Sequence, residues 1–264
     1  MARSNLPTDP RPPGRIRVGT SGFAYPAWAP RFYPPGLASG RLLPHYAGRL
    51  DTVELNNTFY ARPTEARIRT WVGAVGEDFR FVVKAQRGGS FRSLAVSPAE
   101  SVPWLTDPLR RFGERLGTVL FRVPDGVRRD DDKLAALLAA WPRDLPLTME
   151  FQDPSWHVDE VFAALASSGA ALCTTELPED DEPPTIRRTG PFLYLRLRRH
   201  DYSAEDLAAW GARLEPFTDD GLDAFVFFRH DDAGRGAELA LEFAAMTGSA
   251  PERPDATDAT DAVS

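Results

Sequence analysis

Four charged residues stand in segments of the sequence that are otherwise apolar. Glu54 lies in Thr-Val-Glu-Leu, Lys84 in Phe-Val-Val-Lys-Ala, Glu150 in Leu-Thr-Met-Glu-Phe and Arg196 in Leu-Tyr-Leu-Arg-Leu. A charge inside an apolar strand is costly unless it is paired or used. Two carboxylates can serve as acid and base when their surroundings separate their pKa values, and a desolvated lysine amine can act as a nucleophile. Glu54, Lys84 and Glu150 are therefore candidate catalytic residues.

More polar residues follow the same apolar segments, and most of them add positive charge. Candidate ligand-binding residues of this kind are Asn56, Asn57, Arg122, Arg196, Arg198 and Arg229. Because guanidinium groups suit phosphate and carboxylate, this surplus of cations favours a small anionic ligand. The alternative is structural: the charges pair with one another in the core and bind nothing. For one residue alone the two interpretations are balanced, but the four together favour a site.

Aromatic residues lie near the ends of the same segments. Tyr25 and Trp156 are candidate ligand-binding residues, because an aromatic ring can stack on a ring-bearing ligand. Large aromatic side chains can equally pack on one another to close the end of a barrel, and that second interpretation is the more common one.

Eight short segments rich in Val, Phe, Leu and Ile are expected to be the strands that position these residues, as is typical of strands buried on both faces. They are 16–20, 52–56, 79–85, 118–123, 147–151, 171–176, 192–198 and 224–229. Segments with helical periodicity separate most of them, at 41–50, 65–75, 108–116, 130–141, 159–168, 204–214 and 235–247. The connection 177–190 is acidic and Pro-rich, and we expect a loop there in place of a crossover helix.

Strands that alternate with helices pair in parallel through right-handed crossovers. Eight of them predict one α/β barrel of the TIM type. The alternative, an open doubly wound sheet, would usually carry a Gly-rich phosphate loop after its first strand, and residues 19–23 do not form one. In a barrel the candidate residues would meet at the mouth formed by the C-terminal strand ends. The predicted domain is 15–248, between disordered tails at 1–14 and 249–264.

The composition of the 264 residues limits the classes of function. The net charge of −7 disfavours nucleic acid as a partner. Cys173 is the only cysteine and is expected to be a buried structural thiol, while the four histidines lack metal-ligand spacing, so no metal and no cofactor are predicted. No apolar run is long enough to span a membrane, and no secretory signal is evident. A cytoplasmic protein without a membrane partner is expected, and nothing indicates its oligomeric state.

Six groups of motifs between residues 17 and 245 follow one another in the order found in a known family. They are Gly-Thr-Ser-Gly-Phe-Ala-Tyr-Pro-Ala-Trp at 19–28, Phe-Tyr-Pro at 32–34, Val-Glu-Leu-Asn-Asn-Thr-Phe-Tyr at 53–60, Phe-Arg-Phe-Val-Val-Lys at 79–84, Glu-Phe at 150–151 with Ser-Trp at 155–156, and Tyr-Leu-Arg-Leu at 194–197. In these motifs the sequence resembles the YecE-like family (domain of unknown function 72). The resemblance implies a TIM-type barrel. It implies no reaction, because the family has no settled activity.

The sequence also departs from the usual motifs of this family. Glu-Phe-Arg-His is replaced by Glu-Phe-Gln-Asp at 150–153, and Arg-Leu-His-Gly by Arg-Leu-Arg-Arg at 196–199. Phe-Asn-Asn is replaced by Phe-Arg-His at 228–230, and Gln-Leu-Pro-Pro by Arg-Val-Pro-Asp at 122–125. A ligand shared across the family could therefore be altered or lost in this protein. The replaced residues concerned are Gln152, Asp153, Arg198, Arg199, Arg229 and His230.

Three hypotheses for the function remain open, and the sequence does not decide whether the protein is an enzyme. The first is a barrel that binds, and possesses the groups to turn over, a small anionic or phosphorylated ligand at its mouth. The second is a nuclease-like barrel that processes nucleic acid, which ranks behind because metal-dependent versions need converging ligands. The third is a non-catalytic binding or scaffold protein, which fits the altered motifs.

Overall fold

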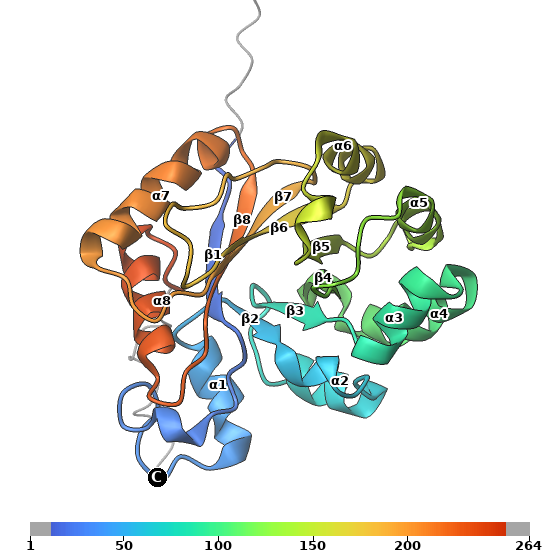
Figure 1. Cartoon of the computed structure of the whole chain (residues 1–264). Helices are drawn as coiled ribbons and strands as arrows, with labels where there is room; N and C mark the ends of the chain where they lie inside the picture. The colour runs from blue at the N-terminus through green and yellow to red at the C-terminus, as the bar shows by residue number, and fades with distance from the viewer. Residues whose placement is uncertain (1–11, 252–264) are drawn as a thin grey trace, which may run out of the picture.

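Eight short parallel strands stand at the centre of the computed structural model, which describes residues 12–251 (Figure 1). The strands are β1 (Ile16–Thr20), β2 (Thr52–Leu55), β3 (Arg80–Lys84), β4 (Leu116–Val123), β5 (Leu147–Phe151), β6 (Ala171–Glu176), β7 (Phe192–Leu197) and β8 (Asp223–Phe228). They pair in the order β1-β8-β7-β6-β5-β4-β3-β2, and one bridge between Ser21 and Glu54 joins the two outer strands. The predicted TIM-type barrel is thus confirmed, with strand bounds within two residues of those expected.

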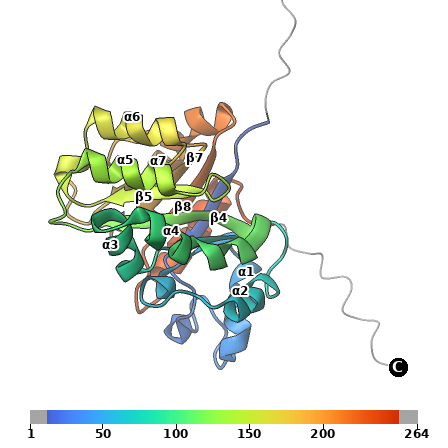
Figure 2. The ribbon, with the colours of Figure 1, turned by 90° about the vertical axis from the view of Figure 1, so that its right-hand side faces the viewer.

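Helices cover the outside of this barrel (Figure 1). They are α1 (Leu42–Ala47), α2 (Glu65–Val72), α3 (Arg87–Ala95), α4 (Pro98–Thr106), α5 (Asp131–Ala140), α6 (Asp159–Ser168), α7 (Ala204–Asp219) and α8 (Arg235–Met246). Short 3-10 helices add η1 (Pro26–Trp28), η2 (Ser39–Arg41), η3 (Asn56–Phe59), η4 (Asp107–Arg115) and η5 (Pro154–Trp156). Figure 2 shows α3 to α6 side by side along the barrel. The connection 177–191 between β6 and β7 has no helical residue.

The connection between β3 and β4 differs from the expected single helix at 108–116. It contains α3, α4 and η4, and the last of these is interrupted at Gly113, which has a φ of 56°. The Gln86 side chain accepts the Gly89 amide and so caps the start of α3. A side chain at Gly89 would come within 2.6 Å of the end of the Leu105 side chain, so the close packing of α3 on α4 favours glycine. Because glycine has a low helix propensity, Gly89 weakens the helical pattern, and α3 is not predicted from the sequence.

Two separate layers of apolar side chains pack on the two faces of the barrel. The inner layer fills the lumen with Val82, Leu120, Ala171, Cys173, Phe192, Tyr194, Phe225 and Phe227. Their strand neighbours, such as Val53, Leu55 and Val83, belong to the outer layer between strands and helices. Because side chains alternate along a strand, Glu54 and Lys84 face the lumen. Cys173 is buried, as expected.

Neither end of the described chain adds a regular element. Residues 12–14 and 249–251 contain no helix or strand, and most of each predicted tail (1–11 and 252–264) lies outside the described residues. Among residues 12–251 no helix has the length and apolar character needed to cross a membrane.

Candidate functional site

Arg196 on β7 lies between the two carboxylates that interrupt β2 and β5. Its NH2 atom is 2.9 Å from Glu54 Oε1, and its NH1 atom is 2.5 Å from Glu150 Oε1. The three residues are at most 3% exposed. Since β2, β5 and β7 are not neighbours in the sheet, these contacts cross the lumen, which a closed barrel brings together at its C-terminal end.

The remaining oxygens of the two carboxylates also contact donors. Tyr194 donates its hydroxyl to Glu54 Oε2 at 2.7 Å, and burial, with Glu54 adding to it, raises the pKa of this tyrosine. Arg122 Nε lies 3.3 Å from Glu150 Oε2, as an ion pair without hydrogen-bond geometry. Burial pushes the pKa of Glu150 up, but Arg196 and Arg122 outweigh it and hold that pKa below its usual value. Glu150 is therefore a poor proton donor at neutral pH.

Lys84 is a cation of this cluster without a carboxylate partner among the described residues. Its side chain, in a residue only 8% exposed, forms no hydrogen bond or ion pair with the residues that the structure describes. The ammonium instead lies 4.6 Å from the centre of the Phe59 ring. Burial lowers the pKa of Lys84 to about 8, with Arg196 adding to the effect and Glu54 opposing it. Its amine can therefore lose a proton near neutral pH, as a nucleophile or base must.

A cavity of about 720 Å³ opens beside these charges. β5 and β6 pair only at Thr148–Ala171 and Met149–Leu172, so the two strands separate toward their C-terminal ends. The helix-free connection 177–191 supplies part of the wall. The charged side chains that line the cavity are the cations Lys84, Arg122, Arg187, Arg196 and Arg198 and the acids Asp125, Glu150 and Asp180, a surplus of two positive charges.

Buried polar atoms without a hydrogen-bond partner concentrate at this end of the barrel. In the described part of the chain they include Ser21 Oγ, Asn56 Oδ1, Arg122 Nε, Glu150 Oε2, Arg196 Nε, Arg198 NH1 and His230 Nδ1. Burial, together with the nearby Arg196, lowers the pKa of Arg198. A buried donor or acceptor left unpaired costs about 1–3 kcal/mol, so such a cluster needs an explanation.

Comparison with known proteins places the chain in a family. The family profile described as "Protein of unknown function DUF72" matches residues 17–262. The chain belongs to the DUF72 family. This confirms the resemblance seen in its motifs.

Relatives of this DUF72 protein align over most of its length, and two solved structures share its fold. UPF0759 protein YunF of Bacillus subtilis (strain 168) is 24% identical over 267 residues, covering 84% of this chain and 94% of YunF. The crystal structure of a DUF72 family protein from Thermotoga maritima has a TM-score of 0.77 at 24% identity, covering 89% of this chain and 99% of that one. A DUF72 family protein from Enterococcus faecalis V583 has a TM-score of 0.72 at 21% identity, covering 89% and 98%.

Other predicted ligand residues of the DUF72 protein lie at the side of the mouth formed by β1 and β2. Tyr25 stacks on His230 with 5.1 Å between ring centres, and its hydroxyl lies 3.4 Å from the Ser21 carbonyl. Asn56 stands in η3 and not in β2, so it does not follow the strand alternation expected for it. Asn57 is exposed. Burial raises the pKa of Tyr25, with Glu54 adding to it and a hydrogen bond with Asn56 opposing it, so both residues lie near Glu54, whereas Asn57 is exposed to solvent.

Two predicted ligand residues lie apart from the 720 Å³ cavity. Arg229 NH1 is 3.5 Å from the His200 ring and lines a separate small hollow with Arg199. Trp156 is fully buried in the outer layer, where it stacks on Phe151 at 4.7 Å and donates its indole N–H to a backbone carbonyl. The contacts of Trp156 are those of a packed core residue.

Tyr194 and Thr175 belong to the site but were not predicted from the sequence. Tyr194 binds Glu54, and the Thr175 hydroxyl lies 3.4 Å from Glu150 Oε1. Tyr194 stands two residues before Arg196, so strand alternation places both on one face, a signal that its apolar neighbours obscured. Among residues 12–251 no three His, Cys, Asp or Glu side chains come together as a metal site would need.

Proposed function

We propose that this DUF72 protein binds a small anion, a phosphate or a carboxylate, at the C-terminal mouth of its barrel. The observation that carries the proposal is the pair of cations Lys84 and Arg198. Both line the 720 Å³ cavity, and burial lowers the pKa of both. Neither forms an ion pair with the residues that the structure describes. An anion between them would supply the missing counter-charge, and charge-assisted hydrogen bonds of this kind are strong.

The roles of the other charges follow from their contacts. Arg196 is paired with Glu54 and Glu150 through NH2 and NH1, and its Nε atom is the one side-chain nitrogen without a partner among the described residues. We propose that the triad of Glu54, Arg196 and Glu150 holds the strand ends of the mouth together. Lys84, Arg122 and Arg198 then bind the anion. Any chemistry on the bound anion is assigned to Lys84, because Arg196 and Tyr194 bind three of the four carboxylate oxygens and the fourth, Glu150 Oε2, forms an ion pair with Arg122.

Thermal unfolding with inorganic phosphate or malonate, at constant ionic strength, tests the proposal. A ligand that binds only the folded state adds about 2.7 kcal/mol at a hundredfold excess over Kd, which for a domain of this size is a rise in Tm of roughly 5 °C or more. Arg198→Gln should lose most of this rise.

Arg110→Gln provides the matched control. Arg110 is exposed and pairs with Asp144, which precedes β5 and so lies at the opposite end of the barrel. This variant should keep the full anion-dependent rise in Tm. An equal rise in the Arg198→Gln protein, or no rise in the wild type with either anion, would show that the mouth is not an anion site.

A further inference from the structure

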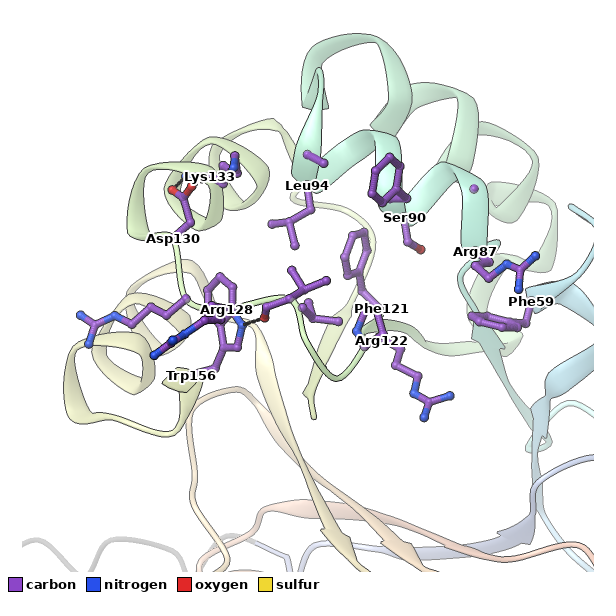
Figure 3. Close-up of a pocket in the computed structure, with 17 residues that line it drawn as sticks. Phe59, Arg87, Ser90, Leu94, Phe121, Arg122, Arg128, Asp130, Lys133 and Trp156 are labelled. Carbon is purple, nitrogen blue, oxygen red and sulfur yellow. Dashed lines mark hydrogen bonds and ion pairs between the residues drawn. The ribbon is translucent and has the colours of Figure 1, made fainter. Parts of the chain in front are cut away.

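A second cavity, of about 530 Å³, lies on the outer side of β4, between α3 and the segment that leads into α5 (Figure 3). Its walls are mainly apolar. Leu94 from α3 and Phe121 from β4 face each other across it, with Val127 and Trp156 beside them. A cavity of this size is within the range of about 300–1,000 Å³ that small-molecule sites occupy.

The face of α3 toward this cavity has the pattern of a packed helix without a complete partner. Arg87, Ser90, Phe91, Leu94 and Ala95 all line the cavity and follow the i, i+3, i+4, i+7, i+8 spacing of one helical face. Phe91 is nevertheless 64% exposed. Ala95 is also exposed, whereas Leu94 is buried. Exposed apolar side chains beside an apolar cavity point to a binding surface.

The apolar cavity adjoins the charged mouth at two residues. Arg122 lines both cavities, and its Nε atom is directed at Glu150. Phe59 lines the apolar cavity, while its ring contacts the Lys84 ammonium at 4.6 Å. In Figure 3 the Arg122 side chain points away from the apolar residues around Leu94. The two cavities therefore share a wall at the C-terminal ends of β3 and β4.

The charged residues at the rim of the apolar cavity indicate which charge a bound ligand can carry. Arg87 and Arg128 are exposed on opposite sides of it, and neither forms an ion pair or hydrogen bond with the part of the chain described here. The one acid that lines it, Asp130, is bound to Lys133 at 2.9 Å. This rim disfavours a cationic occupant and suits a chain attached to an anion.

We infer that the ligand is an anionic amphiphile, with a phosphate or carboxylate head at the mouth and a hydrocarbon chain in the apolar cavity. The head lies beside Lys84 and Arg198, and the chain passes between Arg122 and Phe59 to reach Leu94 and Phe91. This inference rests on the proposed anion site and adds the chemical class of the ligand.

Calorimetric titration with methyl, butyl and octyl phosphate, each below its micellar concentration, tests this inference. Affinity should rise about fourfold for each methylene that becomes buried, which corresponds to about 0.8 kcal/mol. The variant Phe91→Asp should reduce the ratio of octyl to methyl phosphate affinity. Its control is Val96→Asp, since Val96 directly follows α3 and is 72% exposed but does not line the cavity. Val96→Asp should leave that ratio unchanged.

The possible outcomes separate this inference from the proposed function. If methyl phosphate binds and longer chains add nothing, the amphiphile is wrong while the anion site stands. If no alkyl phosphate binds, the amphiphile is wrong, and the anion site fails with it only when inorganic phosphate and malonate also leave the Tm unchanged. If octanol binds as tightly as octyl phosphate, the head-group contact is wrong and the inference is overturned. A dimer that Phe91→Asp dissociates would identify a second copy of the chain as the occupant, which also overturns it.

Discussion

Replacing Lys84 by methionine is expected to make the folded protein more stable at neutral pH. Methionine is unbranched and apolar, and it fits the space of the lysine stem. The wild-type ammonium is buried without a carboxylate partner, and this lowers its pKa from 10.5 to about 8. A lysine that folding makes easier to deprotonate is a lysine whose charge opposes folding.

The size and pH range of the effect follow from these two pKa values. Below about pH 8 both folded and unfolded states carry the proton, and the folded state bears the whole penalty. The difference between 10.5 and about 8 corresponds to about 3 kcal/mol. As the pH rises from about 8 to 10.5, the unfolded chain binds more protons than the folded one, so the stability of the wild type increases relative to the variant. Above 10.5 the penalty is gone.

Denaturant unfolding of both proteins across this pH range measures the effect. Groups other than Lys84 titrate in both, so the difference between their free energies of unfolding isolates this residue. Lys133→Met is a control at the only other lysine, which pairs with Asp130 at the surface and should change stability by less than about 1 kcal/mol. A Lys84→Met protein less stable than the wild type near neutrality, or a difference independent of pH, would refute the reasoning.

Two further substitutions test the triad. Arg196→Met leaves Glu54 and Glu150 buried without their shared cation, so unfolding should become easier by about 3–5 kcal/mol. The loss, measured by denaturant titration, should shrink near about pH 5 because protonation removes the unpaired charge; a loss that stays constant with pH contradicts this. Tyr194→Phe removes the hydroxyl that binds Glu54 at 2.7 Å, and should cost about 1–3 kcal/mol with unchanged circular dichroism. A cost near zero would show that water replaces the hydroxyl.

The barrel could be predicted from the sequence because each strand carries its own signal. Segments such as 147–151 are short, apolar and bounded by helical patterns. When eight such segments alternate with helices, only a few arrangements of the strands are possible. The charged lumen could be predicted for the same local reason: Glu54 and Glu150 interrupt apolar strands. These features depend on a few neighbouring residues, which the sequence displays directly.

The partners inside the site could not be predicted, because they depend on closure of the barrel. Arg196 meets Glu54 and Glu150 across the lumen, from strands that are distant in the chain and in the sheet. The 720 Å³ cavity arises where β5 and β6 separate after two residue pairs, a detail of register that no local pattern carries. Asn56 lies in η3 and not in β2, so the alternation of side chains along a strand does not predict its direction.

The residues that depart from the usual motifs of the family differ in how well the fold explains them. Gln152 accepts the Asp125 amide, and Asp153 accepts the Ser155 amide at the start of η5, so both have local partners. Arg198 and His230 have buried nitrogen atoms without partners, and burial lowers the pKa of each. The His230 ring stacks on Tyr25, but this contact gives neither nitrogen atom a hydrogen-bond partner, and a buried unpaired donor or acceptor is costly. Their presence favours a mouth adapted to an anion over one that has lost its ligand.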